Sequence, residues 1–182
     1  MSGGHGHVDH GGNKGIALLI SILALVLAFS ETLGKGAQTS ALAMNIEASN
    51  LWAFFQAKTI RQTVLRTAAE ELSVSSSSET SRKQVEKWRE TAARYQNEPE
   101  TGEGRDQLAA RAKEAEKKRD RSMAAYHHYE MASAAVQIAI VLASASIITS
   151  IPALVWIAGS LGALGVVFSV IGFFFPTAVH LF

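Results

Sequence analysis

The chain of 182 residues is 48% hydrophobic, and its 17 basic and 16 acidic residues leave a formal net charge of +1. These charges are concentrated in the middle, because residues 131–182 contain no Asp, Glu, Lys or Arg and all but one of the basic residues lie within 35–130. Long uncharged segments around a charged middle are typical of a membrane protein rather than of one globular domain. The absence of cysteine excludes disulfides, thiolate metal sites and a cysteine nucleophile.

Residues 1–14 are predicted to be a flexible tail that is rich in Gly and His. A secretory signal peptide is disfavoured, because only one basic residue precedes the apolar run and no Ala-x-Ala site follows it closely. The tail could bind a transition metal loosely, although tails of this composition more often have no such role; the side chains concerned are His5, His7, Asp9 and His10.

Three segments are long and apolar enough to cross a bilayer. Residues 15–34 would cross roughly 30 Å as a helix with a rise of about 1.5 Å per residue. Residues 131–151 and 153–175 are two further runs of spanning length, and Pro152 between them cannot continue a regular helix without losing a hydrogen bond. We therefore expect three transmembrane helices, the last two forming a tight hairpin.

Each predicted span carries small residues at helical spacing, which let apolar helices approach closely in lipid. The pattern favours a compact bundle within one subunit, although a pore lining of small residues is the alternative. No ionisable residue lies at the centre of a span, which argues against a charge-selective path or a proton relay. The packing positions predicted from this pattern are Ala139, Ala143, Gly162, Gly165 and Gly172.

Residues 35–130 are predicted to form a helical, coiled-coil-like insert between the first two spans. Clusters of turn residues in "SVSSSSE" and "NEPETGEG" divide it into three helices, and Ser81 with Gln84 fits a capping box at the start of the second. We expect an extramembrane bundle of three antiparallel helices, two of them extensions of spans. The second helix carries apolar residues at heptad spacing: Val85, Trp88, Ala92 and Tyr95.

The segment "ASNLWAFFQAKTIR" concentrates large apolar side chains on more than one side of a helix, so a single neighbour cannot bury all of them. We expect Trp88 and Tyr95 to be one partner, and the third insert helix or a neighbouring subunit to be the other. Alternatively, Gly34 and Gly36 break the helix and let the segment lie on the membrane surface. The predicted interaction residues of this segment are Leu51, Trp52, Phe54, Phe55 and Lys58.

A basic cluster precedes the second span. Lys117, Lys118, Arg119 and Arg121 could hold lipid headgroups, but the interleaved acidic residues also fit a solvated helix face and argue against nucleic-acid binding. Because basic residues on this side outnumber the single Lys14 on the other, the positive-inside rule predicts a cytoplasmic insert.

His127, His128 and Glu130 are weak candidates for metal ligands, since His127 and Glu130 are three residues apart on one helical face. Two ligands make a weak site, no other helix supplies a His, and anchoring at the membrane interface explains these residues equally well. The sequence contains no nucleophile, base and acid in a recognisable arrangement and no phosphate-binding loop. We therefore expect neither a cofactor nor an enzyme.

The amino-acid sequence resembles the bacterial domain-of-unknown-function family 4337. The members of this family are small membrane proteins with one span, a helical insert and a terminal pair of spans. The similarity covers residues 16–174, including "AYHHYEMASAAVQIAIVLASAS". Its most specific element is the run Trp52, Phe54, Phe55, Gln56, Ala57 and Lys58. The resemblance implies this architecture and a place in the bacterial cytoplasmic (inner) membrane, and it implies no activity.

These observations predict an all-α, multi-pass membrane protein that acts as a non-enzymatic scaffold or accessory subunit. Its expected partners are membrane lipid and either further copies of itself, as a homo-oligomer, or a larger membrane complex. Two alternatives remain open: a homo-oligomeric channel or transport component, and a metal-dependent enzyme subunit.

Overall fold

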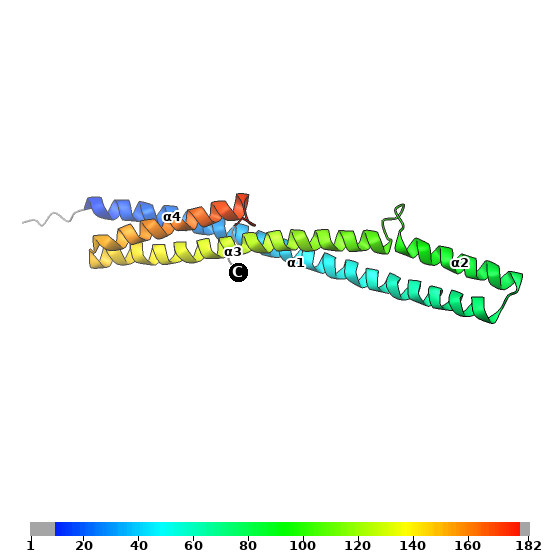
Figure 1. Cartoon of the computed structure of the whole chain (residues 1–182). Coiled ribbons are helices and arrows are strands. Elements are labelled where there is room, and N and C mark those ends of the chain that lie inside the picture. The colour runs from blue at the N-terminus through cyan, green and yellow to red at the C-terminus, as the bar shows by residue number, and fades with distance from the viewer. Residues whose placement is uncertain (1–9, 179–182) are drawn as a thin grey trace, which may run out of the picture. The chain divides into compact units, whose positions relative to one another are not determined.

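The computed structural model describes residues 10–178, with side chains from residue 14, and this part of the chain is entirely helical apart from its turns. The predicted metal ligands of the tail, His5, His7, Asp9 and His10, lie outside the described side chains. The helices are α1 (His10–Ser75), α2 (Glu79–Gln96), α3 (Arg105–Thr149) and α4 (Pro152–Phe174), labelled in Figure 1. The predicted all-α fold is confirmed. Each of α1, α3 and α4 contains a stretch that is long and apolar enough to cross a membrane.

Helix α1 continues without interruption through Gly34 and Gly36. The alternative of a helix break at these glycines is therefore wrong. A glycine inside a helix costs only about 1 kcal/mol relative to alanine, which packing along a long helix readily offsets. Gly34 is buried against α3, where a Cβ placed on it would lie 3.4 Å from the Cβ of Tyr129, an ordinary van der Waals contact.

The chain forms two compact units. The first contains α1 up to Ser40, α3 from Arg121 onward and α4, and the second is Ala41–Asp120. In the first unit α4 runs parallel to α1 and antiparallel to α3. Helix α4 begins at Pro152, whose fixed backbone and missing N–H suit the first turn of a helix. Ser150, with φ of 57°, makes the turn before it.

The core of the first unit is made mostly of small residues. Leu23 and Val136 are the two larger side chains of a buried cluster that also contains Ala139, Ala143 and Ala158. The hydroxyls of Ser30 on α1 and Ser169 on α4 share a hydrogen bond of 2.8 Å beside this core.

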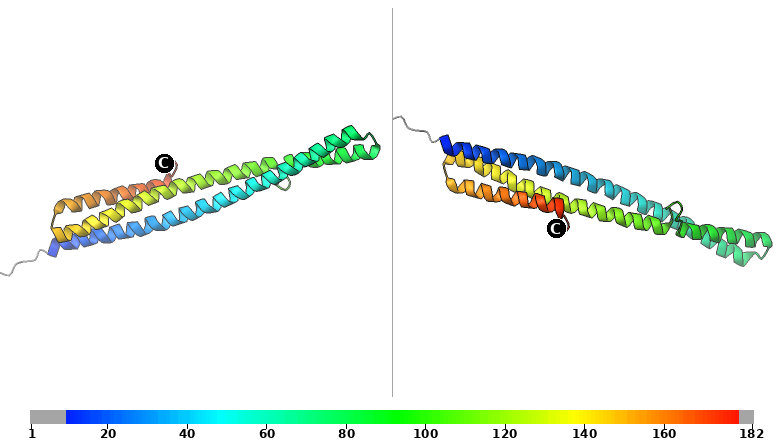
Figure 2. Two further views of the ribbon diagram at one scale, coloured as in Figure 1. Left: turned by 90° about the horizontal axis from the view of Figure 1, so that it is seen from below. Right: turned by 90° about the horizontal axis from the view of Figure 1, so that it is seen from above.

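In the second unit, α1 packs first against α3 and then, further along, against α2, and both run antiparallel to it (Figure 2). Trp52 donates a hydrogen bond to Glu116 on α3 at 2.9 Å, and Gln62 donates one to the carbonyl of Ala92 on α2 at 2.8 Å. Along α1 the buried residues recur at steps of three, four or seven, which is the spacing of a coiled-coil seam. They are Ala41, Ala48, Leu51, Lys58, Gln62 and Ala69.

The expected bundle of three antiparallel helices side by side is therefore wrong, because α2 and α3 occupy successive lengths of one seam. Each of them has a single buried stripe in this unit, marked by Val85 and Ala92 on α2 and by Leu108 and Ala112 on α3. A third helix packed against both neighbours would need two such stripes.

The start of α2 also differs from the expected capping box. Ser78 is the N-cap, and its hydroxyl accepts a hydrogen bond of 3.1 Å from the backbone N–H of Ser81. The capping chemistry is the predicted one, with a serine oxygen satisfying a free N–H of the first turn, but it begins three residues earlier.

Candidate functional site

The aromatic segment of α1 packs on α3. Leu51 is buried in a cluster with Leu108 and Ala112, and Trp52 and Phe55 pack against this cluster. The rings of Trp52 and Phe55 meet edge to face with centroids 5.4 Å apart, a favoured geometry for an aromatic pair. The indole N–H of Trp52 is satisfied by Glu116, so its polar atom does not need a second chain.

Of the expected partners, the buried cluster uses the third insert helix, α3, and the stripe of Trp88 and Tyr95 is not part of that cluster. Trp88 and Tyr95 lie on α2, whereas Leu51, Trp52 and Phe55 contact α3, the helix that is poor in large apolar side chains. The small side chain of Ala112 leaves room on α3 for the large ones of α1, which is why an alanine-rich helix can be the partner. Phe54 is not part of this cluster and is 37% exposed.

Lys58 is a buried cation in the seam, with its side chain 6% exposed. Its ammonium lies 3.0 Å from a carboxylate oxygen of Glu98 and 3.8 Å from one of Glu103. The rings of Phe54 and Tyr95 flank it at 5.4 and 5.5 Å from their centroids, within the range of a cation–π interaction. Through its hydrogen bond, Lys58 holds the pKa of Glu98 below the ordinary value of 4.5.

A second cation, Arg105, is the first residue of α3. Its Nη1 donates to the side-chain oxygens of Gln62 at 2.5 Å and Gln96 at 2.9 Å, and its guanidinium lies 4.8 Å from the centroid of the Phe55 ring. Gln62 and Lys58 occupy successive seam positions, so the seam contains a polar layer next to the loop between α2 and α3. Such polar layers in a coiled coil fix which residues pair, at some cost in stability.

The loop that supplies Glu98 and Glu103 requires its two glycines. Gly102 has φ of +69°, a region that residues with a Cβ rarely adopt. A Cβ on Gly104 would collide with the backbone N of Glu98 and with the side chain of Gln107. The sequence pattern identified the loop but not its contact with Lys58, and the only sequence sign of that contact was a lysine at heptad spacing from Leu51.

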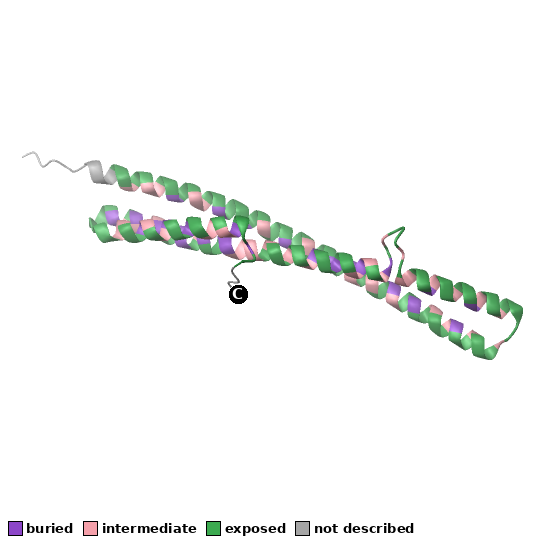
Figure 3. Cartoon of the chain, turned by 45° about the horizontal axis from the view of Figure 1, so that its top comes forward, coloured by how far each residue is buried: buried purple, intermediate pink, exposed green. Residues whose placement is uncertain are grey.

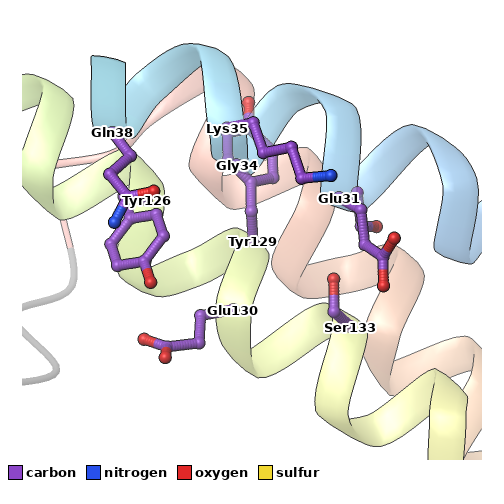
Figure 4. A pocket seen from close by; sticks show the side chains of 9 residues that line it. Glu31, Gly34, Lys35, Gln38, Tyr126, Tyr129, Glu130 and Ser133 are labelled. Atoms are coloured by element: carbon purple, nitrogen blue, oxygen red, sulfur yellow. The ribbon is translucent and has the colours of Figure 1, made fainter. Parts of the chain in front are cut away.

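A polar cavity of about 320 Å³ opens between α1 and α3 in the first unit (Figure 4). It contains two carboxylates, one ammonium and two phenols, and none of its side chains forms a nucleophile and base pair. The lining residues are Ser30, Glu31, Gly34, Lys35, Gln38, Tyr126, Tyr129, Glu130 and Ser133.

The two candidate histidine ligands lie in different surroundings, one partly exposed and one buried. His127 Nδ1 lies 3.6 Å from a carboxylate oxygen of Glu130. His128 is instead buried, 1% exposed, with its ring stacked on Phe168 at a centroid distance of 6.3 Å. Within the described residues there is no group of three or more His, Cys, Asp or Glu that could hold a metal ion.

The predicted small residues lie at helix contacts within the chain. Ala139 and Ala143 are fully buried in the core of the first unit. A Cβ on Gly162 would collide with Leu23 on α1, and one on Gly165 would lie 2.5 Å from Val136 on α3.

Gly172 completes this contact, since a Cβ on it would lie 2.9 Å from the Cβ of His128 and 3.4 Å from the carbonyl oxygen of Ala125. Close approach of α4 to both neighbours therefore depends on residues that have no side chain.

The sequence profile of the family described as a domain of unknown function, DUF4337, matches residues 12–175. The chain belongs to this family. No curated protein and no solved structure matches the chain. The resemblance found in the sequence is thereby confirmed, and the match covers both units of this DUF4337 protein.

The basic cluster of this DUF4337 protein is mostly exposed. Lys117, Lys118 and Arg121 are exposed, whereas Arg119 forms an ion pair of 2.8 Å with Asp120 and a hydrogen bond to Asn45. Three of the four predicted headgroup ligands therefore present their charge to the surroundings.

Proposed function

We propose that the protein is an integral membrane scaffold or accessory subunit without enzymatic activity, which acts by self-association or by docking on a larger membrane complex. The observation that supports the membrane assignment is where the small and the large apolar side chains lie in the first unit, which is the reverse of their places in a water-soluble bundle. Its core consists mainly of Ala and Gly, while large apolar side chains point outward. These include Leu18, Leu25, Phe29, Trp156 and Phe173, all of them exposed.

A water-soluble bundle would bury such residues and place polar ones outside, whereas a lipid-facing bundle gains nothing by burying them. Residues 15–34, 131–151 and 153–175 are accordingly the three spans, and residues 35–130 form the extramembrane insert. The basic residues Lys117, Lys118 and Arg121 support a cytoplasmic position of the insert and contact with anionic headgroups. We propose the bacterial inner membrane as the location, in line with the resemblance found in the sequence.

Two observations support a scaffold over the alternatives. The small-residue faces that a pore would turn to a common axis are used for packing between helices of one chain. Among the described residues, no group of three or more His, Cys, Asp or Glu could hold a metal ion. The charged second unit, with its rigidly paired seam, is suited to presenting a surface rather than to binding a small substrate.

The test is the mass and composition of the complex recovered from the native membrane in mild detergent. Recovery only after detergent extraction, as a homo-oligomer or in a stoichiometric assembly, is the expected result. A protein released from membranes by alkaline carbonate, or one extracted as a monomer without partners, contradicts the proposal.

The side of the insert can be measured separately, because the wild-type chain has no cysteine. Single cysteines placed at the exposed positions Lys87 and Lys118 should be shielded from an impermeant maleimide in intact cells and should react after lysis. Labelling in intact cells would place the insert on the outer side.

A further inference from the structure

In the second unit, α1 has a second apolar face on the side away from its seam. Leu42, Ile46, Ile60 and Val64 are 60%, 53%, 65% and 60% exposed, which is unusual for aliphatic side chains of this size on a charged unit (Figure 3). Three small residues lie between these four. The seven residues follow one another at steps of three or four positions, which keeps the whole set on one side of a helix. We call this set the outer stripe: Leu42, Ile46, Ser49, Ala53, Ala57, Ile60 and Val64, all exposed.

The outer stripe is uncharged in a unit whose other helices are strongly charged, and its only polar member is Ser49. Eight of the 18 residues of α2 are charged, whereas Glu47 is the only charged residue in positions 42–57 of α1. The stripe extends over 23 residues, from Leu42 to Val64, or about 33 Å of helix. An extended exposed apolar surface bordered by charge marks a protein interaction site, and this one lies outside the three predicted spans.

The stripe is symmetric in side-chain size about Ala53, which points to a second copy of the chain as its occupant. Leu42 and Val64 each lie 11 positions from Ala53 (53 − 42 and 64 − 53), and Ile46 and Ile60 each lie 7. The small residues Ser49 and Ala57 each lie 4 positions from it.

A second stripe aligned antiparallel on Ala53 therefore pairs large residues with large ones and small residues with small ones. This is the self-complementary arrangement that a two-fold interface requires. The three small residues at its centre permit close approach of the two helices.

The charges beside the stripe also fit the antiparallel orientation. Glu47 and Arg61 lie on the same flank, six positions before and eight positions after Ala53, and both are exposed. In an antiparallel pair Arg61 comes within two positions, about 3 Å along the axis, of the partner's Glu47, and the reverse pair forms by symmetry. In a parallel pair, the flank with Glu47 and Arg61 would instead face the other flank of the second copy. That flank carries the uncharged Gln56 and Thr63, which cannot form ion pairs with them. Complementary charges of this kind select the orientation of an interface.

We propose that two copies of the protein associate antiparallel through their outer stripes, with the two-fold axis at Ala53. The proposal deepens the proposed function, on which it rests, by naming the partner and the surface.

Cysteine cross-linking of the full-length protein tests the pairing, because the natural chain supplies no competing thiol. Ile46→Cys and Ile60→Cys variants with tags of different length are mixed in mild detergent and treated with a short bis-maleimide. We expect a cross-linked dimer in the mixture, little dimer from either variant alone, and a dimer from Ala53→Cys alone. Lys87→Cys, at an exposed position of α2, is the control for random collision.

Two results overturn the proposal. Efficient cross-linking of Ile46→Cys with itself shows a parallel pair, and a mixture no more cross-linked than the Lys87→Cys control shows that the stripes do not meet.

A charge exchange gives a second readout that does not depend on cross-linking geometry. Ile46→Glu alone should abolish the dimer, and the double variant Ile46→Glu/Ile60→Lys should restore it, because antiparallel pairing sets opposite charges against each other. In a parallel pair the double variant would oppose like charges and would not recover. Both positions are exposed, so unchanged helicity by circular dichroism serves as the folding control.

Membrane extraction on the same preparations separates this inference from the proposed function. If the membrane assignment is wrong, the protein leaves the membrane fraction while the cross-link between positions 46 and 60 persists. If the pairing is wrong, this cross-link is missing from protein that remains in the membrane fraction.

Discussion

The ammonium nitrogen of Lys58 lies 3.0 Å from a carboxylate oxygen of Glu98, at a seam position whose heptad spacing favours an apolar residue. Replacing a buried ion pair by apolar side chains is often neutral or stabilising, whereas removing one partner leaves a buried charge. We therefore expect Glu98→Gln to lower the thermal unfolding midpoint of the protein in mild detergent. The double variant Lys58→Met/Glu98→Met, which replaces both partners by apolar side chains, should melt at or above the wild-type temperature.

The same pair predicts a dependence on pH. The folded-state pKa of Glu98 is lowered, first of all by its hydrogen bond from Lys58. A carboxyl group with a lowered folded pKa stabilises the fold above its ordinary value of 4.5, and this contribution is lost as the pH falls through the lowered value. Wild-type unfolding midpoints should therefore fall below pH 4.5 more steeply than those of Glu98→Gln. Parallel curves for the two proteins would show that the pair contributes nothing to the acid sensitivity.

Much of the fold could be predicted because its causes are local in the sequence. Uncharged runs indicated the three long apolar stretches, Pro152 marked the last turn, and the small residues Gly162 and Gly165 indicated close helix packing. The sequence left the partner of Leu51 and Trp52 undecided between the third insert helix and a neighbouring subunit, because α3 meets them with Leu108 and alanines rather than with large side chains.

The burial of Lys58 was missed for a related reason. A lysine at the end of an apolar segment is typical of a helix surface, and only the loop between α2 and α3 brings Glu98 to it. The outer stripe was also missed. The aromatic residues of α1 around Trp52 dominate the sequence of this region, and the exposed aliphatic residues can be recognised as a separate face only when the seam on the opposite face is known.

Leu108 and Leu42 separate the stability of the second unit from its proposed association. Leu108 is 1% exposed beside Leu51, so Leu108→Ala should destabilise the unit by about 2–5 kcal/mol through lost contacts and a cavity. Leu42→Ala removes the same atoms from an exposed position and should change the free energy of unfolding by less than about 0.5 kcal/mol. Chemical denaturation followed by circular dichroism measures both. The fold assigned to this unit is contradicted if the two substitutions cost the same.

His128 places two polar ring atoms in a buried site, where neither nitrogen has a hydrogen-bond partner within the part of the chain that the structure describes. A buried polar group without a partner costs about 1–3 kcal/mol. His128→Leu should therefore raise the thermal unfolding midpoint, while His128→Ala, which leaves a cavity beside Phe168, should lower it. A large loss of stability in His128→Leu would instead indicate that the imidazole has a bound partner, such as a metal or a ligand, in the native protein.

Gly165 and Gly159 lie on the same helix and differ in what surrounds them. A Cβ on Gly165 would lie 2.5 Å from Val136 Cγ2 and 3.1 Å from the carbonyl oxygen of Ala132, whereas nothing lies within 4 Å of a Cβ on Gly159. Gly165→Ala should separate α4 from α3 and destabilise the first unit by about 1–3 kcal/mol. Gly159→Ala should be neutral or stabilise α4 by up to about 1 kcal/mol, because alanine is the better helix former. Thermal unfolding of the two variants in the same detergent compares them directly, and equal midpoints would show that α4 does not pack against α3 at Gly165.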